Sequence, residues 1–406
     1  MPGDARMTDV IELRTDTGVT YPRGYRAAGM NCGIRPDRPD LAIVVSDEPA
    51  VAAGVFTRNV FAAAPVDISR AHIHSENVCA ILVNAGNANA ATGQDGYDRA
   101  TRCVEETAYR LGCAPAEVLV ASTGKIGVPL PDDTIIAALD ELIAAAGRDG
   151  GAAAADAIMT TDTHRKMCAC DVELSGGTVR IGAMAKGSGM IMPAMATMLA
   201  FVTTDARIPR DRAQALLTRA TATTFNRITV DGDTSTNDSV FLLANGASGV
   251  RVTYEDEKVF AGALTAVCGD LARRMVRDGE GATKFVTVRV TDAATEDEAD
   301  AVARTVANSP LVKTALHGGD PNWGRIVAAA GRAGVVFDPT GVTVELNGIT
   351  VVSGGCAAEF DRDDACEALK EDDIEIVISL GAGSAAVTIW TSDLSHEYID
   401  INVDYN

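Results

Sequence analysis

The segment of residues 186–199 contains the residue types and spacing that could do chemistry. It reads Lys-Gly-Ser-Gly-Met-Ile-Met-Pro-Ala-Met-Ala-Thr-Met-Leu, so that a lysine, two glycines and a proline precede an apolar run interrupted only by Thr197. A threonine hydroxyl acts as a nucleophile when an adjacent base activates it. From the residues alone, the favoured interpretation is a glycine loop entering a strand, with Thr197 as a β-branched strand residue.

Two other glycine or acidic loops imitate ligand-binding motifs. The stretch from Gly381 to Ala386 resembles a dinucleotide-binding loop, but the strand pattern of residues 387–390 follows it where that motif needs a helix, which predicts a glycine hairpin. The loop that begins at Asp231 resembles the start of a calcium loop. Thr236 stands where such a loop needs glycine and Leu242 where it needs glutamate, so we reject calcium.

The cysteines and histidines also favour structural roles. Cys168 and Cys170 lie on an alternating strand pattern without a second ligand pair, which predicts buried thiols rather than a zinc site. His317 precedes Gly-Gly-Asp and is expected to hydrogen-bond within a loop rather than to catalyse. The chain has only five histidines and no G-x-S-x-G motif, so a histidine-driven mechanism is disfavoured.

The elements that must position these residues alternate without a strict βαβ rhythm, which predicts an α+β protein. Strand patterns cover residues 41–45, 52–56, 78–83, 117–121, 167–174, 178–184, 284–291 and 374–380. Helix patterns cover residues 97–111, 131–147, 151–159, 211–224, 257–279 and 295–307. Beyond residue 325 the pattern predicts strands to the end of the sequence.

Composition and charge exclude several function classes. A length of 406 residues predicts two or three domains. Lys and Arg number 35 against 56 Asp and Glu, a net charge of −21, which disfavours binding to nucleic acid or to anionic membranes. No apolar stretch approaches the roughly 20 residues of a membrane span. Nine cysteines and a charged N-terminal stretch predict a soluble protein of the reducing cytoplasm.

Several blocks resemble one enzyme family. Residues 186–199 are very similar to the processing site of the ornithine acetyltransferase family, the glutamate N-acetyltransferases of arginine biosynthesis, whose chains cut themselves between Ala and Thr. Further blocks in family order are residues 54–59, 84–89, 122–127, 158–162, 231–238, 278–284, 308–325 and 398–405. The resemblance covers essentially the whole chain, which is therefore identified as a member of this family.

The resemblance implies a self-processing transferase. The chain is cut between Ala196 and Thr197, and the freed α-amino group of Thr197, with a reference pKa of roughly 7.7–8.0, serves as the base for its own hydroxyl. N2-acetylornithine acetylates Thr197 and ornithine leaves. Glutamate then takes the acetyl group, in a ping-pong scheme that gives N-acetylglutamate without a cofactor or metal. Acetyl-CoA as a second donor, the amino-acid N-acetyltransferase activity of bifunctional members, is left open.

The resemblance also implies roles for individual residues. The Thr123 hydroxyl and the Gly124 N–H form the oxyanion hole. The substrate is held by Thr160, Lys186, Thr197, Glu280 and Asn402, with Lys186 suited to the α-carboxylate and Glu280 to a positive group of ornithine. Without the resemblance, Lys186 and Glu280 are ordinary solvated charges.

One departure from the family pattern concerns the end of the sequence. The family commonly ends in Asn-x-x-Tyr-x-Thr/Ser, with the terminal hydroxyl at the site. Asn402 and Tyr405 match this pattern, but Asn406 is the last residue of the sequence. We expect the last contact to be missing or replaced by the Asn406 carboxylate, with substrate affinity affected more than reaction type.

The implied fold is the N-terminal-nucleophile-like αββα sandwich, followed by a smaller α+β domain. Residues 1–196 form the α chain, residues 197–290 complete the catalytic domain, and residues 291–406 form the C-terminal domain. The two fragments are expected to assemble as a heterotetramer with two of each.

Three alternative functions remain. They are a related acetyltransferase of a specialised pathway, a self-processing aminopeptidase or amidase, and a non-catalytic binder of acetylated amino acids. The intact Ala196-Thr197 pair favours an enzyme.

Overall fold

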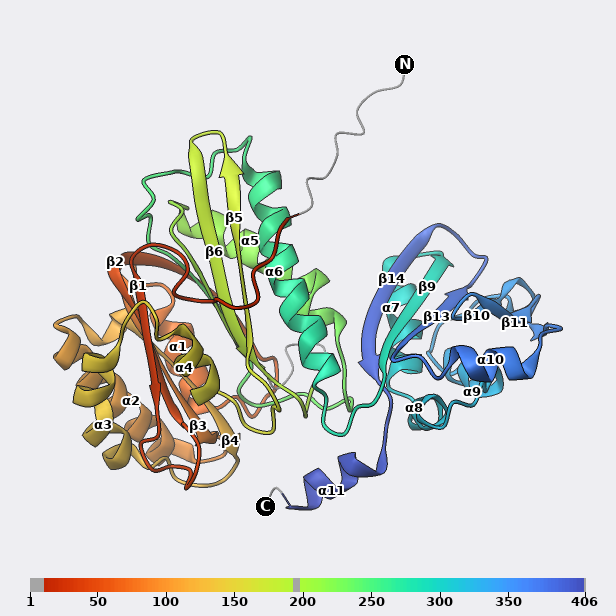
Figure 1. The fold of residues 1–406 in the computed structure, drawn as a ribbon, viewed down its shortest axis with the longest axis horizontal. Coiled ribbons are helices and arrows are strands. Elements are labelled where there is room, and N and C mark those ends of the chain that lie inside the picture. The colour runs from red at the N-terminus through yellow and green to blue at the C-terminus, as the bar shows by residue number, and fades with distance from the viewer. Residues whose placement is uncertain (1–10, 193–197, 405–406) are drawn as a thin grey trace.

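The computed structural model describes residues 11–192 and 198–404, which form two units (Figure 1). The strands of the first unit are β1 (Tyr25–Met30), β2 (Leu41–Phe56), β3 (Val78–Asn87), β4 (Val118–Lys125), β5 (Lys166–Leu174), β6 (Gly177–Lys186), β7 (Leu199–Thr204) and β8 (Ser239–Ala244). Its helices are α1 (Ala64–His72), α2 (Gly93–Leu111), α3 (Asp132–Ala145), α4 (Gly151–Ala157), α5 (Arg210–Thr223) and α6 (Glu257–Arg277).

One long strand joins the two sheets of the first unit. The first half of β2 pairs with β1 and β3, and its second half, Val51 to Phe56, pairs with β8. The sequence predicts two short strands here, and the structure shows one strand with an irregular step between Val45 and Ala50. The exposed residues Asp47 to Pro49 occupy this step, because a polar stretch cannot continue a strand that is buried on both faces.

Apolar residues alternate along the strands and so build three layers of core. Val44 of β2 and Phe241 of β8 face the space between the two sheets. Ile43 faces the outer layer under α2 and α3, and Leu242 faces the outer layer under α5 and α6. Helices therefore cover both outer faces of a two-sheet sandwich, which confirms the predicted αββα architecture (Figure 1).

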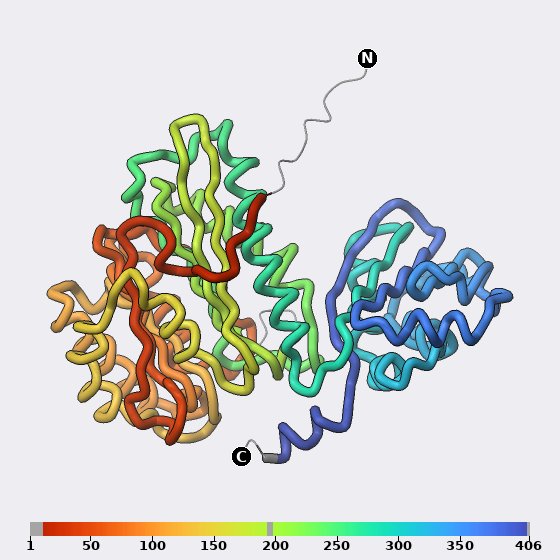
Figure 2. Tube along the Cα trace, in the orientation of Figure 1, coloured from red at the N-terminus to blue at the C-terminus, as the bar shows by residue number. Residues whose placement is uncertain are grey.

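The second unit is built on a six-stranded sheet in the order β12-β11-β10-β13-β9-β14. Its elements are β9 (Phe285–Ala293), α7 (Glu296–Ala307), α8 (Pro310–His317), α9 (Trp323–Gly331), β10 (Thr343–Leu346), β11 (Ile349–Ser353), β12 (Cys356–Ala357), α10 (Arg362–Ala368), β13 (Asp373–Ser379) and β14 (Ala385–Ser392), followed by α11 (His396–Asp404). The chain leaves β14 and returns through α11 toward the first unit (Figure 2).

Two predictions for the second unit are wrong. Strands to the end of the sequence were expected, but α9, α10 and α11 are helices; α9 buries Ile326, Ala329 and Ala330 at helical spacing. The glycine loop after β13 is not a hairpin, since β13 and β14 pair with opposite edges of β9 rather than with each other. Ala382 N and Gly383 N donate to the Asp292 carbonyl, so the loop crosses the end of β9.

Candidate active site

One cavity lies where the ends of β4 and β6 meet the loop before β8, the loop between α6 and β9, and α11. Its lining residues are Ala88, Thr123, Gly124, Ile126, Thr160, Thr161, Lys186, Gly189, Met190, Ser235, Thr236, Asn237, Glu280 and Asn402. The cavity brings together every described residue predicted for the site, namely Thr123, Gly124, Thr160, Lys186, Glu280 and Asn402. The predicted cleavage pair, Ala196 and Thr197, lies outside the described residues.

Thr123 and Gly124 enter the cavity wall from the end of β4. This strand runs parallel to β3, with Thr123 opposite Ala85 and Gly124 opposite Gly86. Gly124 has a φ of +133°, which glycine adopts without strain. A Cβ at this position would lie 2.2 Å from the Gly86 carbonyl carbon, so the close approach of the two strands requires glycine.

Replacing Gly124 by alanine should therefore separate β3 from β4 at the cavity. We expect a loss of at least about 1–3 kcal/mol of stability from overpacking, together with loss of activity. Gly127→Ala is the matched control, because Gly127 also has a positive φ of +79° but no neighbouring atom within 4 Å of the point that a Cβ would occupy. Melting temperatures would compare the two variants, and an equal decrease in both would contradict the close-packing argument.

Lys186 is a buried ammonium at the end of β6. Its Nζ donates to Thr160 Oγ1 at 2.7 Å and to Thr123 Oγ1 at 3.4 Å. Burial lowers the pKa of Lys186 below its ordinary value, and Asp162, 3.9 Å from Nζ, acts in the opposite direction. Only 2% of Lys186 is exposed, so the interpretation from residues alone, a solvated charge, is wrong for this lysine.

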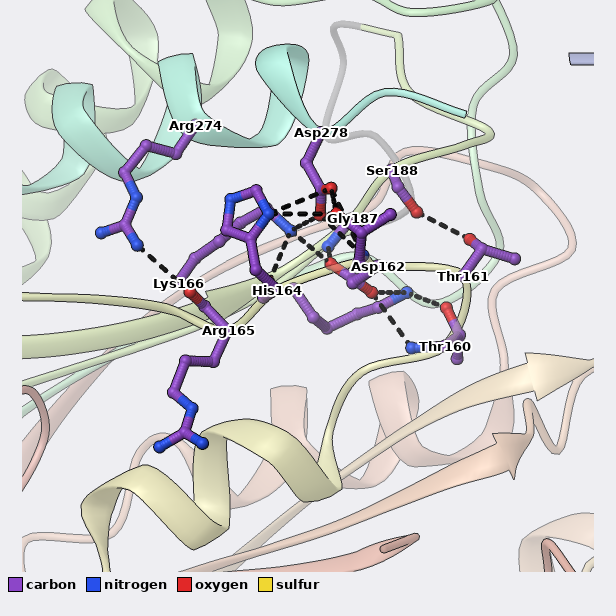
Figure 3. A network of polar contacts seen from close by, with 12 residues as sticks. Thr160, Thr161, Asp162, His164, Arg165, Lys166, Gly187, Ser188, Arg274 and Asp278 are labelled. Atoms are coloured by element: carbon purple, nitrogen blue, oxygen red, sulfur yellow. Dashed lines mark hydrogen bonds and ion pairs between the residues drawn. The ribbon is translucent and has the colours of Figure 1, made fainter. Parts of the chain in front are cut away.

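Asp162, which lies 3.9 Å from Lys186 Nζ, belongs to a network of buried charges (Figure 3). Lys166 Nζ lies 2.7 Å from Asp162 Oδ1 and 2.5 Å from Asp278 Oδ2. Asp162 also accepts from the backbone of Thr160 and of Gly187. Burial acts to raise the pKa of Asp162, but Lys166 and Lys186 outweigh it and hold that pKa well below the ordinary value. Lys166 thereby ties the loop before β5 to the loop after α6.

Glu280 and Asn402 also line the cavity and contact each other. Glu280 N donates to the Ser188 carbonyl at 2.9 Å, and the Glu280 side chain packs against Gly189, where a Cβ would lie 2.3 Å from its carboxyl carbon. Asn402 of α11 donates through Nδ2 to Glu280 Oε2 at 2.8 Å. The last helix of the chain thus contributes to a cavity that is otherwise built by the first unit and the loop after α6.

The register of β6 and β7 places the start of β7 at this cavity. Lys186, the last residue of β6, pairs with Leu199, the first residue of β7. Met198 N donates to Asp238 Oδ1 at 2.9 Å, and Met198 O accepts from Ser239 N at 3.2 Å. The chain therefore enters β7 directly beside the buried Lys186.

Sequence reasoning gave no role to the acidic loop before β8, although the structure places its carboxylates against Met190, Ile191 and Met198. Asp231 accepts from Met190 N at 2.5 Å and from Ile191 N at 2.9 Å. Burial raises the pKa of Asp231 to about 6. The available signal was a pair of carboxylates, Asp231 and Asp238, in a polar loop that leads into a wholly apolar strand pattern.

The remaining candidates lie away from the cavity. Cys168 and Cys170 are buried on β5, which confirms their prediction, and burial raises the pKa of Cys170 to about 12. His317 ends α8 instead of lying in a loop, and its Nδ1 is 2.8 Å from Asp393 Oδ2. Within the described residues, no cluster of His, Cys, Asp and Glu is placed to hold a metal ion, and no helix is long and apolar enough to cross a membrane.

The sequence matches a known family over nearly its whole length. The ArgJ family profile matches residues 26–406. The chain belongs to the ArgJ family. The arginine biosynthesis bifunctional protein ArgJ of Chlorobaculum tepidum is 48% identical over 402 residues, covering 98% of this chain and 100% of that protein. The protein of the same name from Gloeobacter violaceus is 46% identical, with coverages of 96% and 98%.

A solved structure is also similar. One chain of an ornithine acetyltransferase from Mycobacterium tuberculosis, complexed with ornithine, is 37% identical and covers 45% of this chain and 98% of its own length, with a TM-score of 0.42. Family membership confirms the resemblance identified in the sequence. This ArgJ family member is an acetyltransferase of arginine biosynthesis.

Proposed function

We propose that this chain cuts itself before Thr197 and then moves the acetyl group of N2-acetylornithine to glutamate through an acetyl-Thr197 ester. The observation that carries the proposal is the pairing of Lys186 with Leu199, which places the start of β7 beside a buried ammonium and the Thr123-Gly124 strand end. The same cavity is also lined by a carboxylate, Glu280. These groups match the charges of an amino-acid substrate.

In the first half-reaction, the freed α-amine of Thr197 takes the proton of the threonine hydroxyl. Oγ attacks the acetyl carbonyl, and the amine of ornithine leaves with a proton. In the second half-reaction, the amine of glutamate attacks the ester and Thr197 is regenerated. The acetyl group stays on the protein between the two halves, so the reaction needs no cofactor and no metal.

The two ends of the substrate meet groups of opposite charge. Lys186 suits the α-carboxylate, and its contact with Thr160 Oγ1 fixes the direction of the ammonium. Glu280 suits the cationic group of ornithine, and Asn402 orients Glu280 through their 2.8 Å hydrogen bond. Because both charged groups are held by neighbours before substrate arrives, little ordering remains to be done on binding.

Thr123 and Gly124 are proposed to stabilise the oxyanion that forms in each half-reaction. Replacing Thr123 by valine keeps the side-chain shape but removes the donor, so kcat should decrease roughly 10²–10³-fold with a much smaller change in KM. Thr123→Ser keeps the hydroxyl and is expected to retain most activity. Steady-state kinetics with both substrates would check this; an unchanged kcat in Thr123→Val would exclude the hydroxyl from the oxyanion hole.

The overall proposal is tested with purified protein, N2-acetylornithine and glutamate, by following ornithine release and by a denaturing gel. Acetyl transfer with two fragments on the gel is expected. Peptide or amide hydrolysis without acetyl transfer would favour the aminopeptidase or amidase alternative, and an active but uncut chain would contradict the mechanism. A second reaction with acetyl-CoA as sole donor tests whether this member also acetylates glutamate directly.

We further propose that the cut protein works in the cytoplasm as a heterotetramer of two fragments of residues 1–196 and two of residues 197–406. Within the chain, β6 of the first fragment pairs with β7 of the second. β7 and β8 of the second fragment lie between β6 and the second half of β2, both of the first fragment, so strands of the two fragments form one continuous sheet. Size-exclusion chromatography with light scattering measures the assembly.

A further inference from the structure

Gly189 lies where the carboxyl group of Glu280 rests on the loop after β6. A Cβ at this position would lie 2.3 Å from the carboxyl carbon of Glu280 and 2.3 Å and 2.4 Å from its two oxygens. The φ of Gly189 lies outside the left-handed region, so the backbone itself does not require glycine here. Glycine is needed because the carboxyl group occupies the space that a side chain at residue 189 would take.

The loop that carries Gly189 is held in place on both sides of this residue. Before it, Gly187 N donates to the buried Asp162 Oδ1 at 2.7 Å (Figure 3). After it, Ile191 N donates to Asp231 Oδ1 at 2.9 Å. These hydrogen bonds fix the backbone, so the loop cannot move away from the Glu280 carboxyl group without breaking them.

The backbone of Glu280 is also fixed, because Glu280 N donates to the Ser188 carbonyl at 2.9 Å. Its carboxyl group, in contrast, is the far end of a flexible side chain, and Asn402 Nδ2 donates to its Oε2 at 2.8 Å. Rotation about the side-chain bonds of Glu280 is therefore the least costly response to a methyl group on residue 189. Such a change should leave the fold intact but displace the carboxyl group.

The position of the Glu280 carboxylate matters because the proposed donor is charged at both ends. Lys186 suits its α-carboxylate and Glu280 suits its terminal amine, and both residues line the cavity. Attraction between opposite charges decreases with distance and is much weaker when water lies between them. A displaced carboxylate would therefore lose its contact with the amine, while Lys186 would keep its own contact.

We propose that Gly189 is a positioning residue that sets the preference of this enzyme for an acetyl donor with a cationic side chain. It acts through Glu280, because the missing side chain at residue 189 leaves room for the carboxylate in the place where Asn402 contacts it. The inference rests on the proposed function, in which Glu280 meets the terminal amine of ornithine. The loop after β6 thus determines one charged contact of the donor, and Lys186 at the end of β6 provides the other.

The test compares N2-acetylornithine with N2-acetylnorvaline, which has the same carbon chain but lacks the terminal amine. Initial rates at varied donor concentration, with glutamate as acceptor, give kcat/KM for each donor, and the ratio of the two values is the donor preference. Gly189→Ala should lower this ratio by roughly 10–10²-fold, as expected for the loss of a hydrogen bond to a charged group. Its kcat/KM for N2-acetylnorvaline should change little, because that donor has no amine for Glu280.

Gly262→Ala is the matched control, because Gly262 is exposed on α6 and a Cβ there would meet no atom within 4 Å. It should keep the wild-type preference. Glu280→Gln removes the charge and should itself abolish the preference. Adding Gly189→Ala to Glu280→Gln should then lower the ratio no further, since both residues act through one contact.

The melting temperature of Gly189→Ala should stay close to that of wild type, and a large decrease would contradict the argument that only a side chain moves. A donor ratio that stays unchanged in Gly189→Ala, including equal losses for both donors, would overturn the inference. Wild type that does not use N2-acetylornithine, or does not prefer it to N2-acetylnorvaline, would instead overturn the proposed function. The two failures are therefore distinguishable.

Discussion

Thr197→Ala should remain a single chain and should lose acetyl transfer by at least roughly 10⁴-fold, as expected when a catalytic nucleophile is deleted. The methyl group of alanine offers no oxygen to attack the Ala196 carbonyl, so the chain is not cut. Without a cut there is also no free α-amine to act as the base. A single substitution thus removes the nucleophile and prevents formation of its base.

Thr197→Ser is the matched control, because it keeps a hydroxyl at the same position. It should still produce two fragments and measurable transfer, whereas Thr197→Ala should do neither. The measurements are mass spectrometry of the fragments, which locates the new N-terminus, and the N2-acetylornithine and glutamate assay. Fragments that begin at residue 197 in the alanine variant would refute the assignment of the nucleophile.

Lys166→Met should destabilise the first unit by about 3–5 kcal/mol and distort the cavity. The ammonium of Lys166 is fully buried between the carboxyl groups of Asp162 and Asp278. Methionine fills the space but removes the ammonium that the two buried carboxyl groups share, which leaves Asp162 with only the more distant Lys186, 3.9 Å away. Asp162 also holds the backbone of Thr160 and Gly187, so its reorientation would disturb the support of Lys186. Thermal and urea unfolding measure the loss.

A second buried lysine allows the same substitution as a control. Lys313 Nζ donates to Thr391 Oγ1 at 3.0 Å and to the Ser392 carbonyl, and within the described residues it has no carboxylate at ion-pair distance. Burial lowers its pKa from 10.5 to about 8. Lys313→Met should therefore lower the free energy of unfolding much less than Lys166→Met. Equal losses would contradict the argument that Lys166 is needed between two buried carboxyl groups.

The pH dependence of stability gives the control an independent check. The pKa of Lys313 is lower in the folded chain than in the unfolded chain. At pH values where the unfolded chain binds the proton and the folded chain binds it less, protonation favours the unfolded state. Wild type should lose stability through this group as the pH falls from about 10.5 to about 8. Lys313→Met should lack this loss, while Lys166→Met should retain it.

The sequence by itself determined most elements of the first unit. The predicted bounds agree with the structure for α2, α3 and α6 and for the β5–β6 pair. Each of these elements buries one face, so its apolar residues recur with the period of a helix or a strand. The family blocks indicated the αββα architecture and six of the residues that line the cavity. Failures concentrate in the second unit, where short helices such as α9 and α10 have too few turns to show a clear period.

Only the tertiary structure decided how charged residues are used. From the residues alone Lys186 is an ordinary solvated charge, yet it is buried with its Nζ 3.9 Å from Asp162. Lys166 is buried between the carboxyl groups of Asp162 and Asp278. The sequence also could not show that the buried carboxyl group of Asp238 accepts from Met198 N. Local patterns report which face of an element is apolar. The burial and partners of a charge depend instead on contacts between residues far apart in the chain, and folding alone brings them together.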